Sequence, residues 1–474
     1  MVRRLLLLMV VGAAGCSGLI GLRDDYYDAP ASLEAGAPDA GDDGPTSPSP
    51  DGPLADAPVD STTDAPPDLD AAPYHLIEDA ASWAAVSPSA TSRFFSGAVS
   101  DGHYLYCVPQ RATSGYSGVV LRYDLTASFT LPGSWTTFDI ASVSAAAKGF
   151  SGGAFDGRYI YFAPDAAAAN HGNMTRYDTT LPVSDAASWE IYDVYAAGLA
   201  AGAGELRGYD GAIFDGRYVY YAPQSSESAP SSIRTTFMGR VLRFDTQAPF
   251  SSWASWTVFD TTQLDVGALG YTGGIFDGRY LFLVPNATAV AARYDTTLPF
   301  SDTTSWSTFS LAAVHPSAAG FFGGTYDGRF LYFMPNHLVG VSQESSITVR
   351  YDTTHAFANA TSWTALDLLN VEPSLGRGFV TGVFDGRYVY YSPFYGGVVL
   401  RFDPRGDFAN ADSGAWSRFA TTSLQANAHD FGSSLWDGHY VYFVPLGPNP
   451  VFVRFDAKDP PWAAPSPIQR STFF

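Results

Sequence analysis

Lysine is nearly absent from this chain of 474 residues. Lys148 and Lys458 are the only two, so arginine supplies almost all of the positive charge. Acidic residues outnumber basic ones by 47 to 26, which gives a formal net charge of −21. An acidic surface repels phosphate backbones, so we do not expect nucleic acid as a partner.

Cysteine is equally scarce, with only Cys16 and Cys107. Cys16 ends an N-terminal leader, and Cys107 lies in the β-forming run 104–108, where we expect a small buried side chain. No intrachain disulfide is therefore expected.

Helical periodicity and catalytic signatures are also lacking. The sequence has no His-Glu-x-x-His spacing, no nucleophile elbow, no phosphate-binding glycine loop and no pattern like the sialidase Asp box. We expect no metal and no cofactor, and the motifs favour a role without catalysis while leaving an enzyme open.

The leader combines a positive start, residues 1–4, with an apolar run, residues 5–11, that is too short to span a bilayer. This arrangement is typical of a secretory signal. Its end, Ala13-Ala14-Gly15-Cys16, resembles a bacterial lipoprotein signal. The resemblance implies lipidation of Cys16 and hence the bilayer as a partner, and Ser17 implies the outer membrane or cell surface. The alternative is an ordinary cleaved signal.

Residues 24–73 hold thirteen Asp or Glu and no Lys or Arg. Such low hydrophobicity and uniform charge cannot offset the entropy cost of ordering the chain. Proline and charge repulsion keep the chain extended. We therefore expect residues 17–73 to be a disordered acidic tether for a folded domain at residues 74–474. The alternative is an acidic segment that binds cations.

Four landmarks recur seven times in residues 74–474. Each copy has a tryptophan, a small-residue run, an Asp-Gly pair followed by a Pro, and an Arg-Tyr-Asp or Arg-Phe-Asp. The tryptophans are Trp83, Trp135, Trp189, Trp256, Trp306, Trp363 and Trp416, and the Asp-Gly pairs begin at Asp101, Asp156, Asp215, Asp277, Asp327, Asp385 and Asp437. The arginines are Arg122, Arg176, Arg243, Arg293, Arg350, Arg401 and Arg454.

The Asp-Gly pairs favour β-hairpins with type I′ turns, in which both central residues take positive φ. Each copy then contains four strands: the small-residue run, the Tyr-rich run that ends at Pro, the Arg-Tyr-Asp strand and the Trp strand. Four antiparallel strands per repeat are typical of a propeller blade. The sequence thus predicts an all-β fold, a monomeric seven-bladed β-propeller of four-stranded antiparallel blades, preceded by a disordered acidic linker.

The paired glycines, the mid-blade Tyr and the late Trp are similar to kelch and galactose-oxidase-type propellers, although here the glycines precede the Asp-Gly turn. The resemblance implies the fold and no function.

Side chains that occur once in every blade are expected to be structural, because chemistry needs one site. We assign an Arg–Asp lattice to Asp156, Arg158, Arg176, Asp178 and their counterparts, and packing between blades to Trp189. The alternatives are catalytic charges and glycan-stacking tryptophans. For ring closure we favour pairing of residues 82–86 with residues 451–456 over a strand from residues 470–474.

Loop lengths distinguish two faces of the ring. The Asp-to-Trp connection spans 11 residues in five blades, whereas the Pro-to-Arg connection ranges from 8 to 20. Variation on a constant scaffold marks the functional face. On that face the residue after Pro is polar in five copies, which makes them a candidate ligand rim or, alternatively, solvent-exposed strand caps: Gln110, Asp165, Gln224, Asn286 and Asn336.

The pattern favours a lipid-anchored envelope module that binds or scaffolds a protein or glycan. The alternative is an extracytoplasmic enzyme that acts on a glycan or another polymer at the long-loop face. Asp165, Asp210 and Glu205 could supply a carboxylate pair for it. A purely structural surface protein is a third hypothesis.

Overall fold

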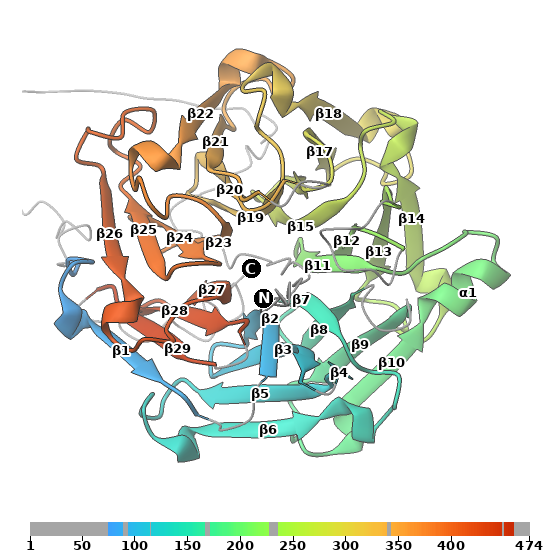
Figure 1. Ribbon diagram of the computed structural model, residues 1–474. Coiled ribbons are helices and arrows are strands. Elements are labelled where there is room, and N and C mark those ends of the chain that lie inside the picture. The colour runs from blue at the N-terminus through green and yellow to red at the C-terminus, as the bar shows by residue number, and fades with distance from the viewer. Residues whose placement is uncertain are drawn as a thin grey trace, which may run out of the picture.

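Each repeat folds into one antiparallel sheet, and the seven sheets stand around a central axis in the computed structural model (Figure 1). The structure describes residues 74–88, 93–113, 115–165, 171–226, 236–338, 343–447 and 450–458. Cys16 and the expected tether, residues 17–73, lie outside these ranges. Within them, no helix is long and apolar enough to cross a membrane.

Four strands run from the axis to the rim in each blade; they are in sequential order in blades 1–6, whereas blade 7 takes its outermost strand, β1, from the start of the described chain. Blades 1 and 2 are β2 (Arg93–Ser100), β3 (Tyr104–Ala112), β5 (Val119–Asp124), β6 (Trp135–Asp139); and β7 (Phe150–Phe155), β8 (Tyr159–Pro164), β9 (Asn173–Asp178), β10 (Trp189–Asp193). Blades 3 and 4 are β11 (Tyr209–Phe214), β12 (Tyr218–Pro223), β13 (Arg240–Asp245), β14 (Trp256–Asp260); and β15 (Tyr271–Phe276), β16 (Tyr280–Pro285), β17 (Val290–Asp295), β18 (Trp306–Ser310). Blades 5 and 6 are β19 (Phe321–Tyr326), β20 (Phe330–Pro335), β21 (Ile347–Asp352), β22 (Trp363–Asp367); and β23 (Phe379–Phe384), β24 (Val389–Pro393), β25 (Val398–Phe402), β26 (Trp416–Ala420). Blade 7 is β27 (Phe431–Trp436), β28 (Tyr440–Pro445), β29 (Phe452–Asp456) and β1 (Trp83–Val86).

Short helical turns decorate this sheet scaffold. The two-residue strand β4 (Gly115–Tyr116) adds to β3, and α1 (Val194–Ala200) projects at the rim after β10 (Figure 1). The sequence of this helix shows no helical periodicity, so it was not predicted. The Asp193 carboxylate caps the helix by accepting a hydrogen bond from the Ala196 N–H at 3.0 Å. Single 3₁₀ turns flank most rim strands, at Ala80–Ser82, Pro132–Ser134, Ile140–Ser142, Ala186–Ser188, Trp253–Ser255, Thr261–Gln263, Thr303–Ser305, Leu311–Ala313, Ala360–Ser362, Leu368–Asn370 and Thr421–Ser423.

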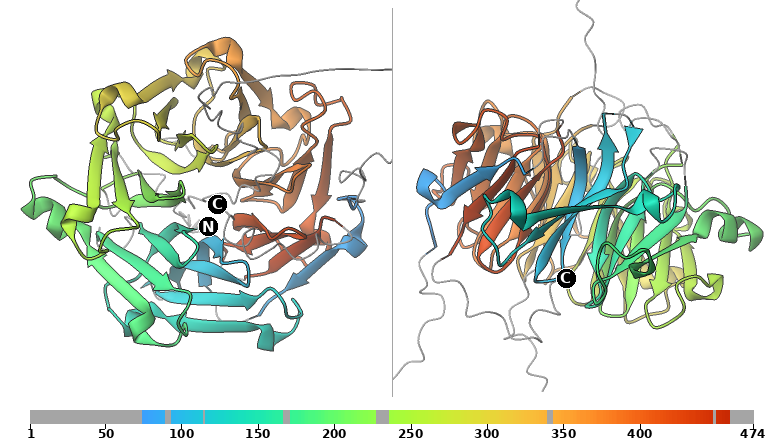
Figure 2. Two further views of the ribbon diagram at one scale, coloured as in Figure 1. Left: turned by 180° about the vertical axis from the view of Figure 1, so that it is seen from behind. Right: turned by 90° about the horizontal axis from the view of Figure 1, so that it is seen from below.

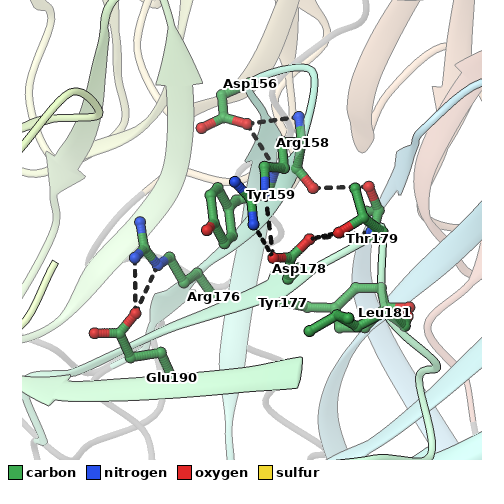
Figure 3. Close-up of polar contacts among 10 residues, drawn as sticks. Asp156, Arg158, Tyr159, Arg176, Tyr177, Asp178, Thr179, Leu181 and Glu190 are labelled. Atoms are coloured by element: carbon green, nitrogen blue, oxygen red, sulfur yellow. Dashed lines mark hydrogen bonds and ion pairs between the residues drawn. The ribbon is translucent and has the colours of Figure 1, made fainter. Parts of the chain in front are cut away.

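The Asp-Gly hairpins form where expected, but the type I′ prediction is wrong. In the second copy Gly157 has a φ of +97°, whereas among the described residues Asp430 alone takes positive φ without being a glycine. Asp156 therefore precedes the bend, and its Oδ1 accepts the N–H groups of Arg158 and Tyr159 at 2.8 and 2.6 Å (Figure 3). Oδ2 accepts the Tyr161 hydroxyl at 2.6 Å. The carboxylate, rather than a mirror-image turn, holds the bend.

Small residues let the inner strands approach their neighbours. A Cβ on Gly153 would lie 2.4 Å from the Tyr161 carbonyl oxygen, closer than any side chain tolerates. The adjacent Gly152 has a φ of +69° at a bulge in the pairing of β7 with β8. The close approach expected of these residues near the axis is therefore present.

Tryptophans pack between adjacent blades. Trp189 in blade 2 stacks on Tyr177 at 4.8 Å and on Phe138 of blade 1 at 5.5 Å, and its indole N–H donates to the Val183 carbonyl at 3.0 Å. Five other blade tryptophans make the same type of bond. Trp416 does not, and its Nε1 is buried without a partner in the described part of the chain. Its connection from Asp403 is two residues longer than the 11-residue connections of other blades.

The N-terminal segment closes the ring, which confirms the favoured pairing. β1 pairs with β29, with Trp83 opposite Phe455 and Val86 opposite Phe452. Trp83 also stacks on Phe419 of blade 6 at 4.5 Å, and the Arg401 guanidinium donates to the His75 carbonyl at 2.8 Å. Residues 470–474, the alternative, lie outside the described residues.

Replacement of the closing tryptophan should weaken the whole ring. Because Trp83 is 7% exposed and contacts blades 6 and 7, we expect Trp83→Ala to lower the free energy of unfolding by about 3–5 kcal/mol in urea denaturation. Trp253→Ala removes a partly buried tryptophan outside the closure and should cost less. Equal losses for the two variants would contradict closure through Trp83.

Candidate functional site

The antiparallel pairing puts two kinds of connection on opposite faces of the ring (Figure 2). The Asp-Gly turns and the connections from third to fourth strands lie on one face, which we call the constant face. The connections from second to third strands, and from each fourth strand to the next blade, lie on the variable face. The variable face carries β4 and the connections of unequal length.

On the constant side, the arginine of the Asp-Gly turn binds the aspartate of Arg-Tyr-Asp, whereas the arginine of Arg-Tyr-Asp has a partner on the fourth strand. Arg158 from the Asp-Gly turn lies 2.7 Å from Asp178, while Arg176 lies 2.7 Å from Glu190 (Figure 3). The two charges of Arg-Tyr-Asp thus take different partners, and Asp156 binds backbone instead of arginine.

The Arg-Tyr-Asp arginines also join neighbouring blades. The Arg176 guanidinium lies 4.1 Å from the Tyr159 ring centroid and 4.6 Å from that of Phe250 in blade 3. The same arrangement, a guanidinium between a ring of its own blade and a phenylalanine of the next, recurs at Arg243, Arg293, Arg350 and Arg454. In blades 1 and 7 histidine replaces the turn arginine yet keeps its partner: His103 lies 3.5 Å from Asp124, and His439 lies 3.0 Å from Asp456.

The five candidate rim residues are not solvent-exposed caps. Their exposed fractions are 1–5%: Gln110, Asp165, Gln224, Asn286 and Asn336. They reach across to the next blade where contacts are resolved: Gln110 Nε2 donates to Asp165 Oδ2 at 3.3 Å, and Asn286 Nδ2 donates to the Phe321 carbonyl at 3.1 Å. We call this set the polar rim.

A second polar column, which sequence reasoning missed, begins the inner strands. It consists of the residue after the aromatic that pairs with the blade's proline. This residue is polar in blades 1–4 and apolar or glycine in blades 5–7: Ser96, Ser151, Asp210 and Thr272, then Phe322, Val380 and Gly432. Ser151 donates to Asp210 at 2.7 Å across the blade boundary. In blades 6 and 7 the residues after Pro, Phe394 and Leu446, pack with Phe322 and Val380 in one apolar cluster.

The variable side of the axis is therefore divided into a polar sector, blades 1–4, and an apolar sector, blades 6 and 7 with Phe322 of blade 5. The bulge differs in parallel. In blades 2–4 it contains a glycine with φ of +69° to +91°, namely Gly152, Gly211 and Gly273. In blades 5–7 the pairing of the first two strands resumes one residue earlier, and no residue of the bulge has a positive φ. The sequence contains a signal that could have predicted these two sectors: the change from polar to apolar at the position of Ser96, Ser151, Asp210 and Thr272.

The carboxylates proposed for hydrolysis separate into two environments. Asp165 and Asp210 are 2% and 1% exposed in adjacent blades of the polar sector. Glu205 instead binds Arg207 at 3.0 Å, and that guanidinium lies 4.9 Å from the Tyr195 ring. Within the described ranges, no group of three or more His, Cys, Asp or Glu side chains could hold a metal ion.

No protein-family model and no curated protein matches this chain. Among solved structures, it is similar to a catalytically inactive virginiamycin B lyase from Staphylococcus aureus with quinupristin, at a TM-score of 0.51 and 11% identity over 79% of this chain and 98% of that one. The chain is a seven-bladed β-propeller. The propeller is also similar to BamB from Moraxella catarrhalis, at a TM-score of 0.37 and 13% identity over 75% of this chain and 82% of that one. At such identities the likeness concerns the fold alone.

The arginine–aspartate pairs should make stability sensitive to acid. Burial raises the pKa of Asp352, but hydrogen bonds from Arg329 and Thr354 outweigh it and hold the pKa well below its ordinary value. A depressed folded-state pKa contributes stability above about pH 4 that is lost as the pH falls further. The pKa of Asp385 is shifted in the opposite direction, because burial raises it despite hydrogen bonds from Tyr388 and Tyr390.

We therefore expect Arg329→Gln to flatten the fall in melting temperature between pH 4 and pH 2, measured by circular dichroism. Asp352→Asn should flatten it further, because Asn does not titrate, whereas in Arg329→Gln the hydrogen bonds from Thr354 still lower the pKa of Asp352. A fall parallel to that of the unmodified protein in both variants would contradict this account.

Proposed function

We propose that this protein is a lipid-anchored β-propeller of the bacterial outer membrane or cell surface, which binds a protein or glycan through its variable face. The observation that carries the proposal is where the chain enters the ring. Tyr74 pairs with Lys458 just beyond β29, and its ring lies 5.4 Å from that of Tyr388, next to an Asp-Gly turn. The described chain therefore begins on the constant face, at Tyr74.

An anchor at Cys16 would then leave the variable face free for a ligand, because the expected tether joins the propeller on the opposite, constant face. The constant face repeats the same ion pairs and turns in blade after blade, which suits a scaffold. The variable face has two chemically different sectors, and a specific ligand needs such asymmetry. We include a kelch-like relationship in the proposal, supported by the glycine pair of the inner strand and by the packing of Trp189 between blades.

The anchor can be tested separately from binding. Cys16→Ser removes the thiol that would carry the lipid, so we expect the protein to move from the membrane fraction to the soluble fraction on cell fractionation. Cys107→Ser serves as the control because Cys107 is fully buried and should leave the distribution unchanged. Retention of Cys16→Ser in the membrane would contradict lipidation.

The binding face can be tested by attaching a polyethylene glycol chain to single introduced cysteines. Val266 is 87% exposed on the variable face, and Leu131 is 59% exposed on the constant face. We expect modified Val266→Cys to lose binding to a glycan array and to purified envelope proteins, and modified Leu131→Cys to retain it. Cys107 is buried and should not react.

Loss of binding only after modification at Leu131→Cys would contradict the assignment of the face. The second candidate, an envelope enzyme, is favoured by the buried carboxylates Asp165 and Asp210 in adjacent blades. Turnover of an array glycan or another polymer that is abolished by Asp210→Asn would replace the binding module with that enzyme.

A further inference from the structure

In this molecule, tyrosine rings beside carboxylates repeatedly hold an arginine. Tyr159 does so with Arg176 and Arg158, at 4.1 and 4.8 Å. The variable face has a smaller version, in which Arg207 lies over Tyr195 and binds Glu205. A guanidinium over a ring is attracted by the ring quadrupole, and a nearby carboxylate adds to the attraction.

Tyr395, in the connection from β24 to β25 on the variable face, departs from this rule. With 43% of its surface exposed, it is the most exposed aromatic residue in the described part of the chain. Its ring meets the edge of Phe394 at 4.2 Å, so its base rests on the apolar sector. No arginine among the described residues lies over it.

Two carboxylates from neighbouring blades flank this ring. A Cβ on Gly378 would lie 3.1 Å from Tyr395 Cδ2 and 3.5 Å from Glu344 Cγ, which places both side chains against one residue. Burial, then Glu344, then Asp430 raise the pKa of Tyr395 to about 12. The ring therefore lies in a negative field. Glu344 has only a loose ion pair, 3.8 Å from Arg377.

Asp430 is held in an unusual backbone conformation. Its φ is +60°, at a position where blades 2–6 have a glycine. In blade 4 that glycine, Gly270, faces Ala287. In blade 7 the glycine stands on the opposite side, as Gly447, and a Cβ built on it would lie 3.4 Å from the Asp430 side chain. The exchange makes room for a carboxylate on this face, and strained residues of this kind cluster at functional sites. His429 Nδ1 lies 2.9 Å from its Oδ1.

Two buried polar groups in the neighbouring blade 5 lack a partner among the described residues. Asn336 Nδ2 and Ser345 Oγ belong to residues that are 5% and 4% exposed, and neither atom has a hydrogen bond. Backbone hydrogen bonds link both residues to Gly378, which lies against Tyr395. Ser345 N donates to the Asn336 carbonyl, and Gly378 N donates to the Ser345 carbonyl. Leaving such buried donors unpaired is costly.

We propose that Tyr395, Glu344 and Asp430 form a site for an arginine or lysine side chain in a basic peptide segment of a partner protein. The incoming cation would lie over the Tyr395 ring between the two carboxylates and complete the arrangement that Arg176 makes within the scaffold. The proposal deepens the proposed function of the variable face and rests on it. A negative field at the ring favours a cationic peptide over a neutral glycan.

The test is binding of fluorescent hexa-arginine to the full-length protein in 150 mM NaCl, with hexa-citrulline as the uncharged probe. We expect saturable binding of hexa-arginine alone, weakened roughly 3–10-fold by Tyr395→Leu, Glu344→Gln or Asp430→Asn. Asn tolerates the left-handed conformation, so Asp430→Asn should leave the backbone unchanged. Arg377→Gln removes a competing cation and should tighten binding.

Asp265→Asn is the matched control, because it removes one charge from an exposed loop of the same face in blade 3. Hydrogen exchange distinguishes the site from adsorption to the acidic residues 24–73: the peptide should protect the amides of Gly378 and Tyr395. Equal affinities for Glu344→Gln, Asp430→Asn and Asp265→Asn, absence of that protection, or no saturable binding would overturn the proposal. If a glycan or protein still binds the variable face in those cases, the proposed function stands without this site.

Discussion

An arginine held between two aromatic rings joins one blade of this propeller to the next. Arg176 lies between Tyr159 of its own blade and Phe250 of the following one, and it is fixed from the side by Glu190. In blades 1, 3 and 4 a Ser or Thr hydroxyl takes the place of Glu190. The contact combines apolar packing with a charged group whose outer edge keeps a polar partner, so it tolerates partial exposure. A lysine has no planar group to place between two rings, which fits the near absence of lysine from the chain.

The recurring landmarks were sufficient to predict the blade count, the strand order and the two faces, because each depends on a pattern that every repeat shares. The closing strand was recognisable because residues 82–86 resemble the fourth strand of a repeat. The backbone conformation within a repeat was not predictable from the residue types alone. The Asp156 carboxylate holds its turn through Tyr161 and two backbone N–H groups, which the Asp-Gly pair alone does not reveal. Gly152-Gly153 and Gly323-Gly324 have the same letters but only the first pair contains a positive φ.

The candidate site shows the same limit. The residues after Pro were recognisable as a column, yet their burial depends on the neighbouring blade, so exposure could not be deduced from the repeat. Asn286 illustrates this, since its amide partner is the carbonyl of Phe321 in the next blade. The exposed ring of Tyr395 follows from a short connection that no repeat consensus describes.

Division into sectors gives one face of a nearly symmetric ring a direction. Polar side chains cross the blade boundaries on one side of the axis, while Phe322, Val380, Phe394 and Leu446 form a separate apolar cluster on the other. The backbone differs along the same division, because the pairing of the first two strands resumes one residue earlier in blades 5–7 than in blades 2–4. The scaffold can thus stay regular while its variable face does not.

Closure by β1 determines how the ring would bear mechanical load. Trp83, at the start of β1, pairs near the constant face, and Val86 pairs toward the variable face. A pull on the chain before Tyr74, directed away from the constant face, therefore runs along the strand axis. It loads the hydrogen bonds between β1 and β29 together, in shear, rather than opening them one after another. A propeller closed in this way would resist being dragged by its own N-terminus.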